Sequence, residues 1–202
     1  MATITRNWAL TAHGQQEEAI EQMRQGLAAY QATGTEVIRP HFLALLSEAL
    51  IRARKLDEGI RVLEDALAVA HSNGERYYES ELYRLKGELL LKQSTGGVVS
   101  KVAAVGMAGA VYKVAAVGKN IVAEPPSVTN AEACFRQSIK IAQQQRAKSL
   151  ELRAVMSVAR LYQKQGRQKE ARSLLAQIYD RFTEGFDTVD LREAKALLGD
   201  LL

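Results

Sequence analysis

Few residues of this sequence combine the types and the spacing that catalysis or ligand binding requires. Gly118 and Lys119 resemble the end of a phosphate-binding loop, in which a lysine after a glycine reaches phosphate oxygens. That loop also needs a glycine where this chain has Lys113, and a serine or threonine where it has Asn120. The match fails at two required positions, so the pattern predicts no nucleotide site.

The histidines and the cysteine do not suggest a metal or redox centre. His13, His41 and His71 are not at the spacing of metal ligands. Cys134 is the single cysteine, which excludes an intrachain disulfide and favours a reducing compartment. No nucleophile with a neighbouring base stands out. We therefore predict a protein that is not an enzyme, with no catalytic residues, no cofactor and no metal site.

Two further groups invite a chemical interpretation. The acidic pairs Glu17/Glu18 and Asp57/Glu58 resemble acid–base pairs, but they precede amphipathic segments, where carboxylates stabilise the start of a helix. Trp8 could stack on a ligand or cover the open end of an N-terminal half-repeat. We favour the covering role for Trp8 and a structural role for the carboxylates.

The elements that would position these residues show a long period. Four segments share a small residue followed by apolar residues four and eight positions later, which is one face of a helix. The segments are EEAIEQMRQGLAAY, DEGIRVLEDALAVA, NAEACFRQSIKIAQ and KEARSLLAQIYDRF, with small residues Ala19, Gly59, Ala131 and Ala171. A second helical pattern precedes three of these segments, over 40–54, 77–93 and 148–165. A further amphipathic helix follows Thr188 and would cap the array.

The spacing of the small residues locates an insertion. Ala19 and Gly59 are 40 residues apart, as are Ala131 and Ala171, whereas Gly59 and Ala131 are 72 apart. One repeat therefore carries about 32 extra residues, which fall within 94–129 and include the hexapeptide KVAAVG twice. The predicted organisation is repeats over 1–93, the first of them partial, a low-complexity insertion over 94–129, and repeats with a capping helix over 130–202.

Three structures are possible for the insertion. Its glycines and Pro125-Pro126 favour a flexible excursion or a weak hairpin around GMAGA, with no function of its own. The alternatives are an apolar helix over 98–117 that docks on a partner or on a membrane surface, or self-association through the β-prone stretch VVSKVAAV.

The repeat pattern resembles the tetratricopeptide repeat, in which small residues lock two antiparallel helices together. Ser47, Gly87 and Ala159 fill the small position of the first helix, and Ala66 and Ser138 fit the later one in the second. The resemblance implies an all-α superhelical solenoid of stacked helix-turn-helix units. The period is 40 residues rather than about 34, so other helical solenoids such as HEAT repeats remain an alternative.

A more specific resemblance covers most of the chain outside 94–129. ELYRLKGELLL, together with the sequence from AEACFRQSIKIAQQQ to LREAKALL, is similar to the C-terminal repeat region of large bacterial signalling ATPases, which are often fused to class III nucleotide cyclase or kinase domains. The resemblance implies a regulatory or scaffolding module in a bacterial signalling system. It implies no catalysis, because the catalytic modules of that family are not among these residues.

Composition limits the surroundings and the partners. The net charge is +4 and the isoelectric point is near 9.2, but the 27 basic and 23 acidic residues are mixed along the chain. The first residues lack an apolar stretch with a cleavage site, and the run 102–112 is about half of what a membrane helix needs. We expect a cytoplasmic protein that does not bind membranes.

The resemblance places the partner-binding surface on the concave face, formed by the first helices of the repeats. Carried over position by position, the groove residues are Glu48, Arg52, Arg84, Glu88, Lys92, Arg153, Arg160 and Lys164. We expect a protein or peptide partner of acidic character, or neighbouring domains of a parent signalling protein. The alternative is a nucleic-acid-binding solenoid that uses the groove Arg and Lys residues, which the mixed charges make the weaker prediction.

Overall fold

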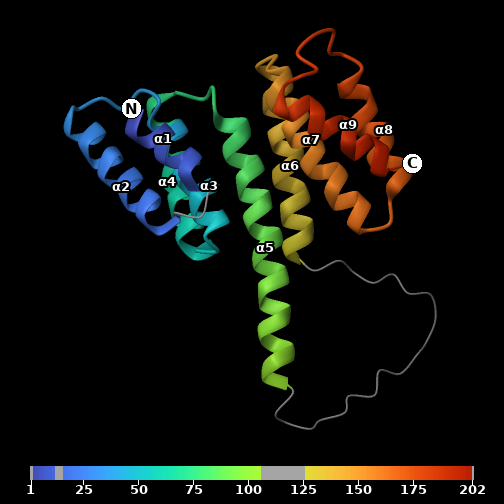
Figure 1. Cartoon of the computed structure of the whole chain (residues 1–202), viewed down its shortest axis with the longest axis horizontal. Coiled ribbons are helices and arrows are strands. Elements are labelled where there is room, and N and C mark those ends of the chain that lie inside the picture. The colour runs from blue at the N-terminus through green and yellow to red at the C-terminus, as the bar shows by residue number, and fades with distance from the viewer. Residues whose placement is uncertain (1, 12–15, 106–125, 202) are drawn as a thin grey trace.

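The computed structural model describes the backbone of residues 2–11, 16–105 and 126–201, and their side chains outside 95–127. All regular secondary structure in these residues is helical (Figure 1). The helices are α1 (Ala2–Leu10), α2 (Gln16–Ala32), α3 (Arg39–Arg52), α4 (Leu56–Asn73), α5 (Glu79–Val105), α6 (Pro126–Gln144), α7 (Lys148–Lys164), α8 (Gln168–Tyr179) and α9 (Val189–Asp200).

The helices pack in consecutive pairs, and the pairs stack in chain order. Each odd-numbered helix contacts the next odd-numbered helix, from α1 through to α9, as well as its neighbours along the chain. The odd-numbered helices therefore form an inner layer and the even-numbered helices an outer one. This arrangement confirms the predicted all-α repeat solenoid. Among the described helices, none combines the length and the apolar character that crossing a membrane requires.

The turns after α3, α6 and α7 share one backbone geometry. Arg54, Arg146 and Gly166 have φ of 60°, 55° and 76°, and the next residue donates its N–H to a carbonyl five residues back, at 2.9 Å in each case. This is the bonding of a Schellman motif, which satisfies carbonyls at a helix end. Glycine is the residue type usual at this position, as at Gly166, whereas the arginines at Arg54 and Arg146 are not.

Small residues allow the paired helices to approach closely. Ser47 of α3 donates from Oγ to the Gly59 carbonyl oxygen of α4 at 3.1 Å. Gly87 of α5 faces Phe135 of α6 so closely that a β-carbon on Gly87 would lie 2.4 Å from the ring. The small residues that define the repeat are buried in the helix pairs, as the spacing predicted; they are Ala19, Ser47, Gly59, Ala66, Gly87, Ala131, Ser138, Ala159 and Ala171.

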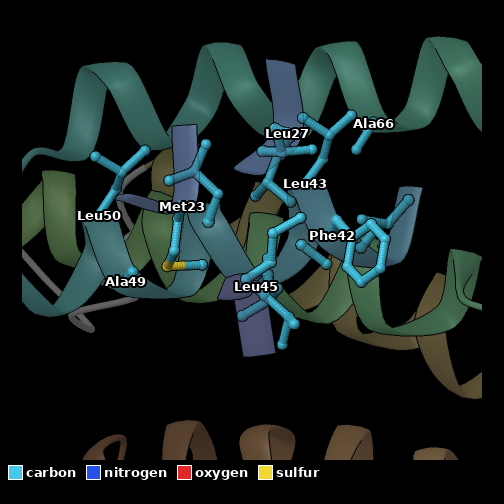
Figure 2. Packing of buried hydrophobic residues seen from close by; sticks show 14 of the residues in the cluster. Met23, Leu27, Phe42, Leu43, Leu45, Ala49, Leu50 and Ala66 are labelled. Carbon is cyan, nitrogen blue, oxygen red and sulfur yellow. The ribbon is translucent and has the colours of Figure 1, made fainter. Parts of the chain in front are cut away.

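The core consists of two apolar clusters with α5 between them. The first cluster joins α1 to α4 with one face of α5, and Figure 2 shows its centre, where Met23, Leu43 and Leu50 interdigitate. The second cluster joins α6 to α9, with Leu90 and Leu91 of α5 packed against it. Figure 1 shows the same division, with α1–α4 on one side of α5 and α6–α9 on the other. Helix α5 therefore couples the two halves of the solenoid.

The first residues of the predicted insertion are helical, whereas its composition favoured a flexible segment or a hairpin. Helix α5 continues to Val105 and projects beyond the rest of the bundle, and α6 begins at Pro126 (Figure 1). Extending an existing helix avoids the unfavourable nucleation step, so Gly96 and Gly97 do not end it. The helical alternative for 98–117 agrees with the structure over 98–105. The predicted GMAGA hairpin and the second KVAAVG lie outside the described residues and stay predictions.

Candidate functional site

The inner layer encloses a cavity of about 450 Å³, which we call the inner groove. Every odd-numbered helix contributes to it, so no single repeat could form it. Its lining residues are Trp8 of α1, Glu48 and Arg52 of α3, Arg84 of α5, Arg153, Met156 and Arg160 of α7, and Val189, Asp190 and Glu193 of α9.

The structure brings together five of the eight residues that the sequence placed on this face. Glu48, Arg52, Arg84, Arg153 and Arg160 all line the inner groove. The other three lie on the same helices. Of these, Glu88 is adjacent, since its Oε1 accepts a hydrogen bond of 2.9 Å from Ser157 and lies 3.5 Å from the Arg84 guanidinium. Lys92 and Lys164 lie further along α5 and α7 and are not among the lining residues.

A buried carboxylate, which is not itself a lining residue, contacts two of the arginines that line the inner groove. Glu81 is only 2% exposed and accepts two hydrogen bonds from Arg84, at 3.0 and 2.7 Å. It also lies 3.0 Å from Arg153. Burial alone would raise the pKa of Glu81, but the two guanidinium groups hold it below its ordinary value. Sequence reasoning missed Glu81, although the Glu81–Arg84 spacing of three is an ion-pair signal within a helix.

Aromatic side chains lie next to this ion pair. The His41 and Tyr78 rings meet edge to face, with centroids 4.5 Å apart. Burial raises the pKa of Tyr78 to about 12 and lowers that of His41. At neutral pH both side chains are therefore uncharged, and they form an apolar surround that strengthens the neighbouring Glu81–Arg153 attraction.

Trp8 occupies the end of the inner groove formed by α1 and α3. Its Nε1 donates to Glu48 Oε2 at 2.9 Å, and the Arg52 guanidinium lies over the indole, 5.1 Å from the ring centre. The ring also packs against the first apolar cluster. Its position is compatible with both roles considered from the sequence, since it covers core residues and faces the inner groove.

The inner groove is balanced in charge rather than basic. Each of its four arginines lies within 4.0 Å of a carboxylate: Arg52 with Glu48, Arg84 and Arg153 with Glu81, and Arg160 with Glu193. The Arg52–Glu48 and Arg84–Glu81 pairs lie within one helix each, whereas Arg153 and Arg160 of α7 meet carboxylates of α5 and α9, which the sequence of α7 alone could not show. The pairing reduces the positive field that the arginines alone would produce.

The other candidates from the sequence occupy structural positions. Glu17/Glu18 and Asp57/Glu58 lie in the first turns of α2 and α4, as predicted. Cys134 is half-buried and burial raises the pKa of its thiol, which disfavours the reactive thiolate. Within the residues that the structure describes, no group of three or more His, Cys, Asp and Glu side chains is placed to hold a metal ion. His13 lies outside the described residues.

Comparison with known proteins found neither a matching family model nor a curated protein of significant similarity. The tetratricopeptide resemblance and the signalling role that it implies therefore stay proposals.

Proposed function

We propose that this chain is a non-catalytic protein-interaction module that binds a segment of a partner in the inner groove. One observation carries the proposal: five charged residues that the tetratricopeptide resemblance implied for the concave face line a single cavity of about 450 Å³. Trp8 and Met156 line it as well. Tryptophan, arginine and methionine are the residue types enriched where proteins bind one another.

The chemistry of the inner groove supports binding rather than catalysis. The buried carboxylate beneath the lining residues, Glu81, pairs with two arginines, and its lowered pKa makes it a poor proton donor or acceptor near neutral pH. The outer carboxylates Glu48 and Glu193 are likewise paired with arginines. Such pairs position hydrogen-bond donors for a ligand but do not activate a nucleophile.

The proposed partner is an acidic segment whose carboxylates replace those of the exposed ion pairs in the inner groove. Arg160 and Glu193 are 43% and 53% exposed, and an exposed pair contributes only about 0–1 kcal/mol. A partner carboxylate can therefore replace Glu193 at little cost and form a bidentate contact with Arg160. The buried pairs to Glu81 would stay in place as the rigid base of the site.

The biological role that we propose is that of a regulatory or scaffolding repeat region in a cytoplasmic bacterial signalling ATPase or nucleotide cyclase system. This part of the proposal rests on the tetratricopeptide and ATPase resemblance. The partner would then be a peptide, another protein, or a neighbouring domain of a parent chain.

Peptide selection followed by charge reversal tests the binding site. Peptides selected from a random display library on the full chain should bind Arg160→Glu at least tenfold more weakly than the native chain, because the introduced carboxylate repels an acidic ligand. Arg172→Glu is the matched control, since Arg172 is exposed on α8 and does not line the inner groove. Equal loss of affinity in both variants, or in neither, would contradict the proposal.

The basic isoelectric point keeps a nucleic-acid-binding solenoid as a second candidate. That function requires arginines free to contact phosphates, whereas each inner-groove arginine is paired with a carboxylate. An oligonucleotide affinity that falls steeply with salt and disappears in Arg153→Ala and Arg160→Ala would favour this candidate over the peptide one.

A further inference from the structure

A second cavity lies between α6, α7 and α8, with a volume of about 650 Å³; we call it the outer groove. It shares no lining residue with the inner groove. Its lining residues are Arg136, Ile139, Lys140 and Gln143 of α6, Val158 and Tyr162 of α7, and Lys169, Glu170, Ser173, Leu174 and Gln177 of α8.

The two grooves lie on opposite sides of α7. Met156 and Arg160 line the inner groove, while Val158 and Tyr162 line the outer one. Two residues along a helix correspond to a rotation of roughly 200°, so Val158 points away from the side on which Met156 lies. A ligand in one groove therefore does not touch the other, and a substitution in one can serve as a control for the other.

The floor of the outer groove is apolar and rigid. Val158 and Tyr162 are buried, and Ile139 and Leu174 are half-buried on either side of them. The Tyr162 hydroxyl donates to Glu132 at 2.7 Å, and the Arg167 guanidinium stacks on its ring at 3.6 Å. These contacts fix the floor before any ligand arrives, which lowers the entropic cost of binding.

The rim of the outer groove carries positive charge that is not compensated within the described structure. Arg136 pairs with Glu132, and Arg167 pairs with Glu170. Lys140 on α6 and Lys169 on α8 form no ion pair with any residue that the structure describes. The two lysines stand on opposite walls of the apolar floor. This arrangement differs from the inner groove, where every arginine has a carboxylate partner.

The walls of the outer groove suit a helix better than an extended chain. The α6 wall residues, from Arg136 to Gln143, follow the spacing i, i+3, i+4, i+7, which is about two helical turns or roughly 11 Å. The α8 wall from Lys169 to Gln177 has a similar length. A third helix can pack its side-chain ridges between such walls and satisfies its own backbone hydrogen bonds. An extended peptide would find no strand edge here to pair with.

We propose that the outer groove docks an acidic amphipathic helix of a partner protein. Its apolar face packs on Ile139, Val158 and Leu174, and its carboxylates pair with Lys140 and Lys169. The proposal is independent of the function assigned to the inner groove. If both grooves are occupied, the repeats α5–α8 join two partners on opposite sides of α7.

A helical peptide library tests the docking surface on the full chain. Each probe is a display-selected helix with leucine fixed at i, i+3, i+4 and i+7 and with Glu, Lys, Ser or Ala at the flanking positions. We expect glutamate to be enriched beside the leucine face. We expect the selected peptide to bind the Lys140→Glu, Lys169→Glu double variant at least tenfold more weakly. A peptide with lysines in place of those glutamates should regain affinity for the double variant.

Two controls separate this surface from the rest of the molecule. Arg172→Glu makes the same charge change on α8 outside the outer groove, and Arg160→Glu alters only the inner groove; both should leave the affinity unchanged. Lys140 and Lys169 are exposed, so the double variant should fold, which circular dichroism checks. The proposal is overturned if no peptide is enriched, if the enriched peptides lack glutamate, if the double variant binds normally, or if Arg160→Glu abolishes binding.

Discussion

At the scale of single residues, Arg54 and Arg146 adopt a backbone conformation that favours glycine. Both have positive φ, both are exposed, and neither forms an ion pair with a described residue. A β-carbon in this region costs roughly 1–2 kcal/mol, partly offset because glycine also loses more conformational entropy on folding.

Replacing either arginine with glycine should therefore stabilise the protein. We expect Arg54→Gly and Arg146→Gly each to raise the free energy of unfolding by about 0.5–1 kcal/mol in urea denaturation. Gly166→Ala is the reverse control, because its new methyl group would meet no atom within 4 Å and only backbone strain changes. A destabilised Arg54→Gly would mean that the arginine side chain has a role of its own.

Gly87 should be the most sensitive of the small repeat positions. The β-carbon that Gly87→Ala adds would lie 2.4 Å from the Phe135 ring. We therefore expect this variant to lose about 1–3 kcal/mol of unfolding free energy. Gly199→Ala on α9 meets open space and should be neutral or slightly stabilising. Replacing the facing ring with a smaller side chain, in Phe135→Leu, should reduce the loss of unfolding free energy caused by Gly87→Ala. If the two losses simply add in the double variant, that would contradict the close approach of α5 and α6.

The small residues could be predicted from the sequence, whereas the strained turns could not. An Ala, Gly or Ser that recurs at 40 residues on either side of the 72-residue spacing predicts where two helices approach closely. Arg54 has a positive φ in the structure, and an arginine gives no local sign of a conformation that favours glycine.

At the scale of elements, Glu81 links α5 to α7 across the junction of the two core clusters. Glu81→Gln leaves Arg84 and Arg153 without their buried partner, and we expect it to cost about 3 kcal/mol at neutral pH. Glu64→Gln, at an exposed position on α4, is the matched control and should change stability by less than about 0.5 kcal/mol.

The pH dependence of the unfolding free energy provides a second measurement on the Glu81→Gln variant. The pKa of Glu81 is lower in the folded chain than in the unfolded chain, where it is about 4.3. Its contribution is therefore present above about pH 4.3 and is lost as the pH falls below that value toward the folded pKa. We expect the native chain to lose more stability between about pH 5 and pH 3 than Glu81→Gln does. Parallel profiles would show that the carboxylate is not held ionised by the arginines.

The extent of α5 shows where element prediction from the sequence fails. Glycine, serine and threonine at 94–97 are typical of a loop, and the repeat register also places the end of a helix there. Continuing a packed helix by a few residues needs only weak propensity, because nucleation has already occurred. The register therefore did not predict the last described residue of the helix that leads into the expected insertion, because α5 runs on to Val105.

At the scale of the whole molecule, the repeat register predicts that the insertion can be removed. Deleting 96–127 joins Thr95 to Val128 and places Ser94 at the turn position that Arg54 occupies in the preceding repeat. The contacts of Gly87 with Phe135 and of Ser80 with Ser138 remain. We expect cooperative unfolding, a circular dichroism signal that falls only by the helical residues removed from α5 and α6, and unchanged binding of peptides selected on the inner groove. Loss of the native helices after deletion would contradict the register.

The position of the inner groove could be inferred from the sequence, but its charge balance could not. Stacked helix pairs place their first helices inside, so residues such as Arg52 and Arg153 could be assigned to that face. The carboxylate partners of Arg153 and Arg160 are brought close only by the packing of helices, since Glu81 lies on α5 and Glu193 on α9. The presence of a groove on each side of α7 could not be inferred either, because it depends on how closely the stacked repeats pack.

The central claim, that a partner segment binds in the inner groove, can be tested with one fluorescence titration. Trp8 is the single tryptophan of the sequence, and it lines that groove beside Glu48 and Arg52. A selected peptide without tryptophan, added to the full chain, should shift and saturate the Trp8 emission with the same dissociation constant that calorimetry gives. Arg160→Glu should raise the dissociation constant measured by both methods to the same extent. Binding seen by calorimetry with no change in Trp8 emission would place the partner elsewhere and contradict the account.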